Sequence, residues 1–286
     1  MNATSRRRLV LRIALYGGAF FGALPAVFSF LLTQTHRAPI SPEPNPPYTQ
    51  VALDSGGLRL RAWLARREPD RAAVIIVHGL GDTLESYQEH AQLFLDRGHT
   101  VLLLDLRGHG GSEGRRTTLG GLESEDVRAA MRFLGPWESG FLLEGHSMGA
   151  VAVLLAAADR TDVRAVIAEA PFDTYRNTVA HHARLLFYLP SWFPLTPLAI
   201  RGAEWRAGFD ADDVDAVAAA SRVSAHLLAI VDGEDRRMPE PVVRRIVDAH
   251  PGSHRIWVAV GVGHVGGVYH PEWKRVVISF LDEHGL

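Results

Sequence analysis

Cysteine is absent from all 286 residues of the chain, which excludes disulfide bonds, cysteine nucleophiles and thiolate metal sites. The absence leaves the redox compartment open, because a core of this size can stabilise an extracytoplasmic domain without disulfides. Lysine is almost absent too: Lys274 is the only one, and the arginines are scattered along the chain. With a formal net charge of −2, the sequence has no basic stripe of the kind that nucleic-acid binding needs. We therefore expect no nucleic-acid partner.

Charge is also absent from a long apolar run near the N-terminus. Residues 13–32 contain no charged side chain, and about 20 residues are enough for a helix to cross a hydrocarbon core of roughly 30 Å. The basic segment 1–12, with Arg6, Arg7, Arg8 and Arg12, comes directly before it. By the positive-inside rule, we expect a single-pass anchor in the cell membrane, with the N-terminus cytoplasmic and the remainder of the chain outside.

Two other interpretations of this run stay open. A cleaved signal peptide would lead to secretion, but its apolar region is usually about 7–15 residues long and ends in small residues. The run here is longer, and the following Thr33-Gln34-Thr35-His36 is a poor cleavage site. The third interpretation is a buried or peripheral helix. The sequence favours the uncleaved anchor.

Prolines dominate the short segment 38–47 that follows. Such a composition favours extended polyproline geometry. We therefore expect a semi-rigid linker that holds the following domain away from the bilayer. The prolines are Pro39, Pro42, Pro44, Pro46 and Pro47.

From residue 48 onward, short apolar runs alternate with helical patterns. Apolar runs bounded by loop residues are typical of strands in a parallel sheet that helices cover on both faces. We therefore expect one α/β domain at 48–286 with a mostly parallel, doubly wound sheet. The predicted strands are 49–54, 58–65, 74–77, 101–104, 141–143, 163–168, 227–231 and 256–260, and the predicted helices are 85–95, 122–134, 147–158 and 242–249.

One interval breaks this alternation. About fifty residues separate two of the predicted strands, which is too long for a simple loop. We therefore expect a small helical cap insertion at about 172–225, above the carboxyl edge of the sheet. Its centre, residues 185–200, is rich in aromatic side chains and prolines.

The strongest local signal is Gly145-His146-Ser147-Met148-Gly149, between a predicted strand and an Ala-rich predicted helix. This context is typical of a nucleophile elbow, in which glycines allow a sharp turn that lifts the serine hydroxyl above the sheet edge. The positive end of the helix favours negative charge that develops nearby. Ser147 is therefore the candidate nucleophile.

A serine hydroxyl needs a base, and the base needs a group that orients it. His264 follows the last predicted strand within a glycine-rich loop, so we assign it as the base; His254 and His270 are less well placed. Asp235 follows the preceding strand and is the favoured acid. Asp232 and Glu234 stay open as alternatives, but we expect their side chains to be solvated or to form the turn. The order Ser, Asp, His is the order expected for an elbow serine.

Backbone amides are the expected oxyanion donors. One is the amide after the nucleophile, at Met148. The other lies in the loop Val77-His78-Gly79-Leu80-Gly81, where Leu80 is our choice, because Gly79 allows the backbone to approach closely.

These motifs resemble the α/β-hydrolase superfamily over nearly all of residues 48–286. The segment 105–112 reads Asp-Leu-Arg-Gly-His-Gly-Gly-Ser, similar to the superfamily's D-x-R-G-H-G-x-S, whose implied role is to buttress the loops around the nucleophile. The combination of this segment with His78-Gly79 and Glu125-Asp126-Val127 makes the sequence similar to the group of serine aminopeptidase-like hydrolases and monoacylglycerol lipases. One departure is the acid loop, where the usual G-x-x-D-x-x-x-P is shortened by one residue between Gly233 and Asp235.

The resemblance implies an α/β-hydrolase fold and a serine hydrolase. Because the cap is apolar and the expected anchor places the site near lipid, we expect a membrane-tethered enzyme that cleaves carboxylic esters, including monoacylglycerols or other lipid esters. We expect no cofactor and no metal, since His181 and His182 are adjacent on a predicted helix and do not share a face. The alternatives are a peptidase or amidase, an acyltransferase, or a non-catalytic binding protein on the same fold. The sequence does not determine the oligomeric state.

Overall fold

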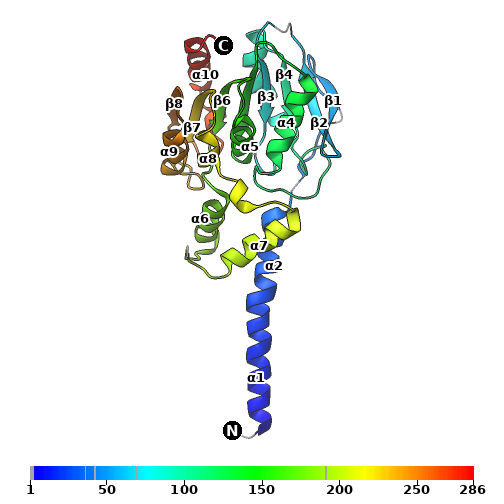
Figure 1. The fold of residues 1–286 in the computed structure, drawn as a ribbon, viewed down its shortest axis with the longest axis vertical. Helices are drawn as coiled ribbons and strands as arrows, with labels where there is room; N and C mark the ends of the chain where they lie inside the picture. The colour runs from blue at the N-terminus through cyan, green and yellow to red at the C-terminus, as the bar shows by residue number, and fades with distance from the viewer. Residues whose placement is uncertain (1–2, 36, 42, 68–69, 191) are drawn as a thin grey trace.

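Figure 1 shows the computed structural model, which describes residues 3–286 except 36, 42, 68–69 and 191. Its centre is an eight-stranded sheet in which the second strand along the chain runs antiparallel to its two neighbours, the first and fourth strands, and all other neighbouring strands are parallel. The prediction of a mostly parallel sheet is confirmed. The strands are β1 (Thr49–Ser55), β2 (Leu58–Ala65), β3 (Ala73–Val77), β4 (Val101–Leu104), β5 (Phe141–His146), β6 (Val163–Glu169), β7 (His226–Asp232) and β8 (His254–Ala259), in the order β1-β2-β4-β3-β5-β6-β7-β8.

Helices cover both faces of the sheet because both faces of its central strands are apolar. In β3, Ala73, Ile75 and Val77 belong to one buried cluster, whereas Val74 and Ile76 belong to the other. The first cluster is shared with α4 (Glu123–Leu134), α5 (Met148–Ala157), α8 (Ala216–Ala220) and α9 (Glu240–Ala249), and the second with the 3-10 turn η2 (Leu84–Tyr87), α3 (Gln88–Asp96) and α10 (Trp273–Glu283).

The long interval between β6 and β7 folds mainly as helices. The helices α6 (Tyr175–Phe187) and α7 (Thr196–Ala207) lie beyond the carboxyl edge of the sheet, and we call this pair the cap (Figure 1). A 3-10 turn, η3 (Ala211–Asp213), follows. The predicted insertion also included α8, but Ala216, Ala219 and Ala220 of that helix are buried in the main core. Only the first part of the interval therefore forms a separate cap.

A long apolar helix projects from the domain on the side where the cap lies (Figure 1). It consists of α1 (Ala3–Gly18), a π-helical turn η1 (Ala19–Ala23) and α2 (Leu24–Thr33). The π turn precedes Pro25, which has no N–H for the i→i−4 hydrogen bonds of an α-helix. Within the π turn, the Leu24 amide donates to the carbonyl oxygen of Ala19, five residues earlier. Residues Thr4–Thr33 are long and apolar enough to cross a membrane, a property that anchors and signal sequences share. The helix begins earlier than the predicted 13–32 because the basic residues are helical too.

Arg37, directly before the proline-rich segment, and Ser41 within it are hydrogen-bonded to the main domain. The Arg37 guanidinium donates to the carbonyl oxygens of Gly110 and Gly114, at 2.8 and 2.9 Å. The Ser41 amide donates to the Glu85 carboxylate at 2.8 Å. These bonds connect the end of the N-terminal helix to the main domain. Residues 1–2 of the basic segment, His36 and Pro42 lie outside the described residues.

Candidate active site

Three loops meet at the carboxyl edge of the sheet, because parallel strands end on the same side. Ser147 follows β5, Asp235 follows β7 and His264 follows β8. These strands are separated by long stretches of sequence, but the sheet order places β5, β6, β7 and β8 side by side. The three predicted side chains are thereby brought together.

The turn at Ser147 has the geometry of a nucleophile elbow. Ser147 has a φ of 52°, a left-handed conformation that is uncommon for residues other than glycine. A Cβ at position 145 would lie 2.3 Å from the Gly149 carbonyl oxygen, and one at position 149 would lie 2.5 Å from the His78 carbonyl oxygen. Both neighbouring glycines are therefore required by close backbone contacts.

Hydrogen bonds connect the three candidate residues in series. The His264 Nε2 lies 2.9 Å from the Ser147 Oγ, and the His264 Nδ1 lies 2.6 Å from the Asp235 Oδ2. The Asp235 Oδ1 accepts from the amides of Arg237 and Met238, at 2.7 and 3.1 Å. Burial alone would raise the pKa of Asp235, but its bonds with His264 and these amides outweigh burial and lower it. Asp235 is therefore held as a carboxylate.

Asp232 occupies a different environment from the one predicted. It is buried, not solvated, and its two carboxyl oxygens accept from the amides of Val265 and Gly267, at 2.6 and 2.8 Å. Asp232 therefore holds in place the loop that carries His264, through amides just after this histidine in the chain. Glu234, the other alternative acid, is exposed. Sequence reasoning missed the role of Asp232 because only the folded loop places these amides over its side chain.

Below the candidate triad lies a buried group of charged side chains from neighbouring strands. The His146 Nδ1 lies 2.6 Å from the Glu169 Oε2, and the His146 Nε2 lies 3.4 Å from Glu144, an ion-pair distance. Glu169 also accepts from the Val268 amide and shares a hydrogen bond with Asp232. Burial and the charge of Glu169 raise the pKa of Asp232 to about 8. Burial alone would lower the pKa of His146, but its contacts with Glu144 and Glu169 raise it to about 9.

These raised pKa values predict that the folded protein loses stability as the pH rises from about 7 to about 9. In the unfolded chain Asp232 and His146 lose their protons at lower pH, near their ordinary pKa values. The folded state therefore holds extra protons, and the stability they contribute disappears as the pH passes through the folded pKa values. The melting temperature measured across this range should fall.

A matched pair of variants attributes this fall to Asp232. Asp232→Asn removes one titrating group, so its melting temperature should fall less steeply over the same range than that of the wild type. Glu234→Gln changes an exposed neighbour and should keep the wild-type slope. An Asp232→Asn slope equal to the wild-type slope would show that Asp232 does not titrate there.

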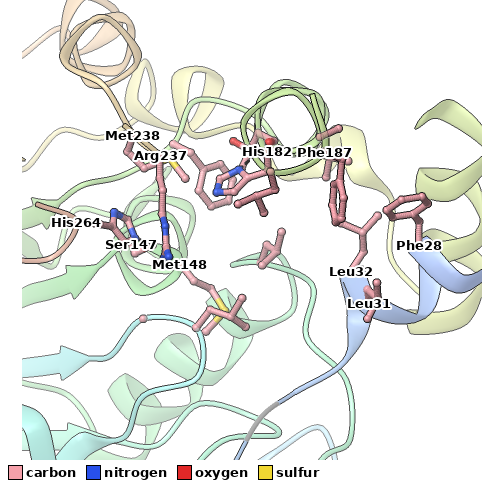
Figure 2. A pocket seen from close by; sticks show the side chains of 18 of the residues that line it. Phe28, Leu31, Leu32, Ser147, Met148, His182, Phe187, Arg237, Met238 and His264 are labelled. Atoms are coloured by element: carbon pink, nitrogen blue, oxygen red, sulfur yellow. Dashed lines mark hydrogen bonds between the residues drawn. The ribbon is translucent and has the colours of Figure 1, made fainter. Parts of the chain in front are cut away.

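Ser147 opens into a cavity of about 500 Å³ with mainly apolar walls. Leu80 and Met148, the predicted oxyanion residues, both line it, and Met148 begins α5, so its amide has no acceptor within the helix. Gly79 lies beside them, where a Cβ would stand 3.4 Å from the Ser147 Cβ. The predicted close approach of this loop is therefore present. Figure 2 shows Ser147 and His264 at one end of the cavity.

The cavity also contains residues that the sequence did not single out. Arg237 and Met238 lie beside His264, whereas Phe28, Leu31 and Leu32 of α2 lie at the opposite end (Figure 2). The Arg237 side chain could have been suspected from its position two residues after the candidate acid. Nothing in the sequence connects α2 with the site, because their contact depends on the tertiary fold.

Histidines and acids near the site have partners that leave little room for a metal. His182 lines the cavity with its Nδ1 2.9 Å from the Thr178 carbonyl oxygen, whereas the His181 Nε2 lies 2.8 Å from the Arg236 carbonyl oxygen. Over the described residues, one group of possible metal ligands is Asp232, Asp235 and His264, with atoms within 4.8 Å of one another. A metal there would displace the hydrogen bonds described above. The arrangement therefore favours proton transfer between His264 and Ser147.

Comparison with known proteins finds similar sequences over much of the chain. The sequence profile described as serine aminopeptidase, S33 matches residues 68–207. The uncharacterized Bacillus subtilis protein YqkD is 30% identical over 218 residues, which cover 73% of this chain and 70% of the relative. The monoglyceride lipase of Rattus norvegicus is 31% identical over 115 residues, which cover 38% of this chain and 37% of the lipase.

Among solved structures, the Pyrococcus furiosus esterase Pf2001 superposes with a TM-score of 0.66. The alignment covers 87% of this chain and 98% of the esterase, at 22% sequence identity. At this identity the similarity establishes the fold.

Proposed function

This chain belongs to the serine aminopeptidase S33 family of the α/β-hydrolase superfamily, and we propose that it is a serine hydrolase that cleaves carboxylic esters with apolar acyl groups. The observation that carries the proposal is the series of hydrogen bonds from Asp235 through His264 to Ser147, at the end of an apolar cavity. This arrangement activates a serine hydroxyl beside a site for an acyl chain.

The proposed reaction is acyl transfer to water. Ser147 Oγ attacks the ester carbonyl carbon while His264 Nε2 takes the hydroxyl proton. The amides of Leu80 and Met148 stabilise the negative oxygen of the tetrahedral intermediate. The intermediate then collapses, the alcohol leaves with the proton from His264, and an acyl-enzyme remains. A water molecule, deprotonated by His264, then attacks this ester. When the second tetrahedral intermediate collapses, His264 returns the proton to Ser147 Oγ and the carboxylic acid is released.

Asp235 orients the base in this mechanism. Its Oδ2 accepts from the His264 Nδ1, which leaves Nε2 free to accept the Ser147 proton. The carboxylate also stabilises the imidazolium that forms. The two amides on Oδ1 keep the carboxylate in place.

The cavity walls favour an ester with an apolar acyl group over a peptide. A peptidase that binds a free amino terminus needs a carboxylate near the nucleophile. Asp82 is a carboxylate at the cavity wall, and its Oδ1 accepts from the Thr83 amide and the Ser86 hydroxyl. The cavity wall beside His264 carries the cation Arg237 (Figure 2). A neutral or anionic ester fits these walls better than a peptide amine.

The function is tested with the purified full-length protein. A fluorophosphonate should react with it stoichiometrically, and mass spectrometry should find the adduct on the peptide that contains Ser147. The protein should also hydrolyse p-nitrophenyl butyrate and octanoate faster than aminoacyl p-nitroanilides. Absence of both an adduct and ester hydrolysis would contradict the proposed function, and faster amide cleavage would favour the peptidase alternative.

We further propose that the N-terminal helix anchors the domain in the cell membrane with the catalytic domain outside. The helix Thr4–Thr33 is long enough to span the bilayer, and its arginines lie at the end far from the domain. Tyr188, Trp192 and Trp205 of the cap region are 90%, 77% and 89% exposed. Such side chains prefer the membrane–water interface, and the cap lies on the side from which the helix projects (Figure 1).

This topology is tested by adding protease to intact cells. We expect the catalytic domain to be degraded while an N-terminal tag stays protected, because the arginines hold the N-terminus in the cytoplasm. A soluble cytoplasmic protein serves as the control for intact membranes. A domain that resists protease until the cells are broken would contradict the outside placement.

A further inference from the structure

The end of the N-terminal helix packs tightly on the cap. The Ser29 hydroxyl lies 2.8 Å from the Ala199 carbonyl oxygen of α7 and 2.7 Å from the Pro25 carbonyl oxygen, so it bonds across the helix contact. At Gly202 of α7, a Cβ would lie 2.1 Å from the Ser29 Oγ. The two helices therefore approach so closely that only glycine fits at this position.

Thr33 attaches the same helix end to both the cap and the main domain. Its hydroxyl accepts from the Arg206 Nε of α7 at 2.9 Å, and its carbonyl oxygen accepts from the Thr117 amide of the main domain at 3.1 Å. The Arg206 guanidinium also lies over the Phe30 ring, 4.6 Å from its centroid. These contacts fix how α2 is placed relative to the candidate active site.

One face of α2 lines the cavity. Phe28, Leu31 and Leu32 are three and four residues apart, which places them on the same face of the helix, and all three line the cavity that contains Ser147. The Phe28 ring meets the Phe187 ring of α6 edge to face, with centroids 5.3 Å apart. Figure 2 shows these residues at the end of the cavity opposite Ser147 and His264.

We propose that this face of α2 is the end wall of the acyl-binding cavity and determines the longest acyl chain that the enzyme accepts. The inference rests on the serine hydrolase function proposed above. An acyl chain attached to Ser147 extends away from the triad along the apolar walls. A short chain ends before it reaches α2, whereas a long chain must contact Phe28, Leu31 and Leu32.

A consequence is that the helix is part of the enzyme and not a removable leader. Cleavage after Thr33 would take away one wall of the cavity together with the contacts of Ser29 with the cap. We therefore expect the active protein to retain α2. The intact mass of the protein purified from membranes measures this directly.

The wall is tested by acyl-chain selectivity of the full-length protein in detergent micelles. The measurement is kcat/KM for p-nitrophenyl acetate, butyrate, octanoate, laurate and palmitate. Leu32→Trp fills the far end, so the ratio of palmitate to acetate kcat/KM should fall about tenfold or more, the usual scale for pocket discrimination. Phe28→Ala enlarges the far end and should raise the same ratio. Leu15→Trp is the matched control, because Leu15 is 69% exposed on α1, away from the cavity, and should keep the wild-type ratio.

Fluorophosphonate labelling of each variant separates the two proposals. Opposite shifts of the ratio in Leu32→Trp and Phe28→Ala, with the wild type labelled on Ser147, support the wall. Wild-type ratios in both variants, again with labelling of Ser147, overturn the wall and leave the serine hydrolase function intact. A wild type that neither reacts with the probe nor cleaves any ester overturns both.

Discussion

Ser147→Ala is expected to lower kcat for ester hydrolysis by about 10⁶-fold, the scale of losing the nucleophile from a serine–histidine–aspartate set. The variant keeps His264 and the backbone amides but has no atom that can form the acyl-enzyme. It should also fail to react with a fluorophosphonate. The left-handed φ of 52° is as strained for alanine as for serine, so the fold and the melting temperature should change little.

A second serine variant serves as the control. Ser221→Ala removes an exposed hydroxyl that donates to the Ala218 carbonyl oxygen and does not line the cavity, so this variant should keep wild-type labelling and rates. Equal probe labelling of Ser147→Ala and the wild type would exclude Ser147 as the nucleophile.

Asp235→Asn is expected to lower kcat by about 10⁴-fold, because an amide no longer selects the histidine tautomer that accepts the serine proton. In the wild type, the Asp235 Oδ2 accepts from the His264 Nδ1 at 2.6 Å. An asparagine that keeps its carbonyl on the two amides presents an N–H to the ring and forces the proton to Nε2. Steady-state kinetics with p-nitrophenyl butyrate measures the loss.

Asp232→Asn is the matched comparison for this variant. Its side chain holds the loop after His264 through two amides and does not bond to the ring in the structure. Burial keeps the pKa of Asp232 at about 8, so the residue is largely protonated at neutral pH. Asparagine is likewise uncharged and keeps one of the two acceptor oxygens. We expect a far smaller loss of kcat than in Asp235→Asn. The opposite ranking of the two variants would identify Asp232 as the orienting acid.

The order and type of the main elements could be predicted from the sequence because their signals are local. Each buried strand is a short apolar run, and in β3 both sets of alternate residues are apolar because both faces are covered. The glycines around Ser147 mark the elbow, since only glycine avoids the close contacts at 145 and 149. The resemblance to α/β-hydrolases, carried by the same motifs, is confirmed by the family match.

The acid loop could not be resolved from the sequence. Asp232, Glu234 and Asp235 lie within four positions of one another, and composition does not tell which one turns toward His264. The folded loop directs Asp235 to the ring, buries Asp232 under the following loop and leaves Glu234 exposed. Backbone turns of one or two residues make this selection.

The strands, the elbow at Ser147, the position of His264 after the last strand and the apolar N-terminal helix could thus be predicted from the sequence alone, because glycine turns and apolar periodicity act over a few residues. The tertiary structure decided that Asp235 contacts His264, that the proline-rich segment is bonded to the domain at Ser41 and that Phe28, Leu31 and Leu32 line the far end of the cavity. These outcomes depend on contacts between residues far apart in the chain. Such contacts form only when the sheet, the cap and the N-terminal helix have packed together.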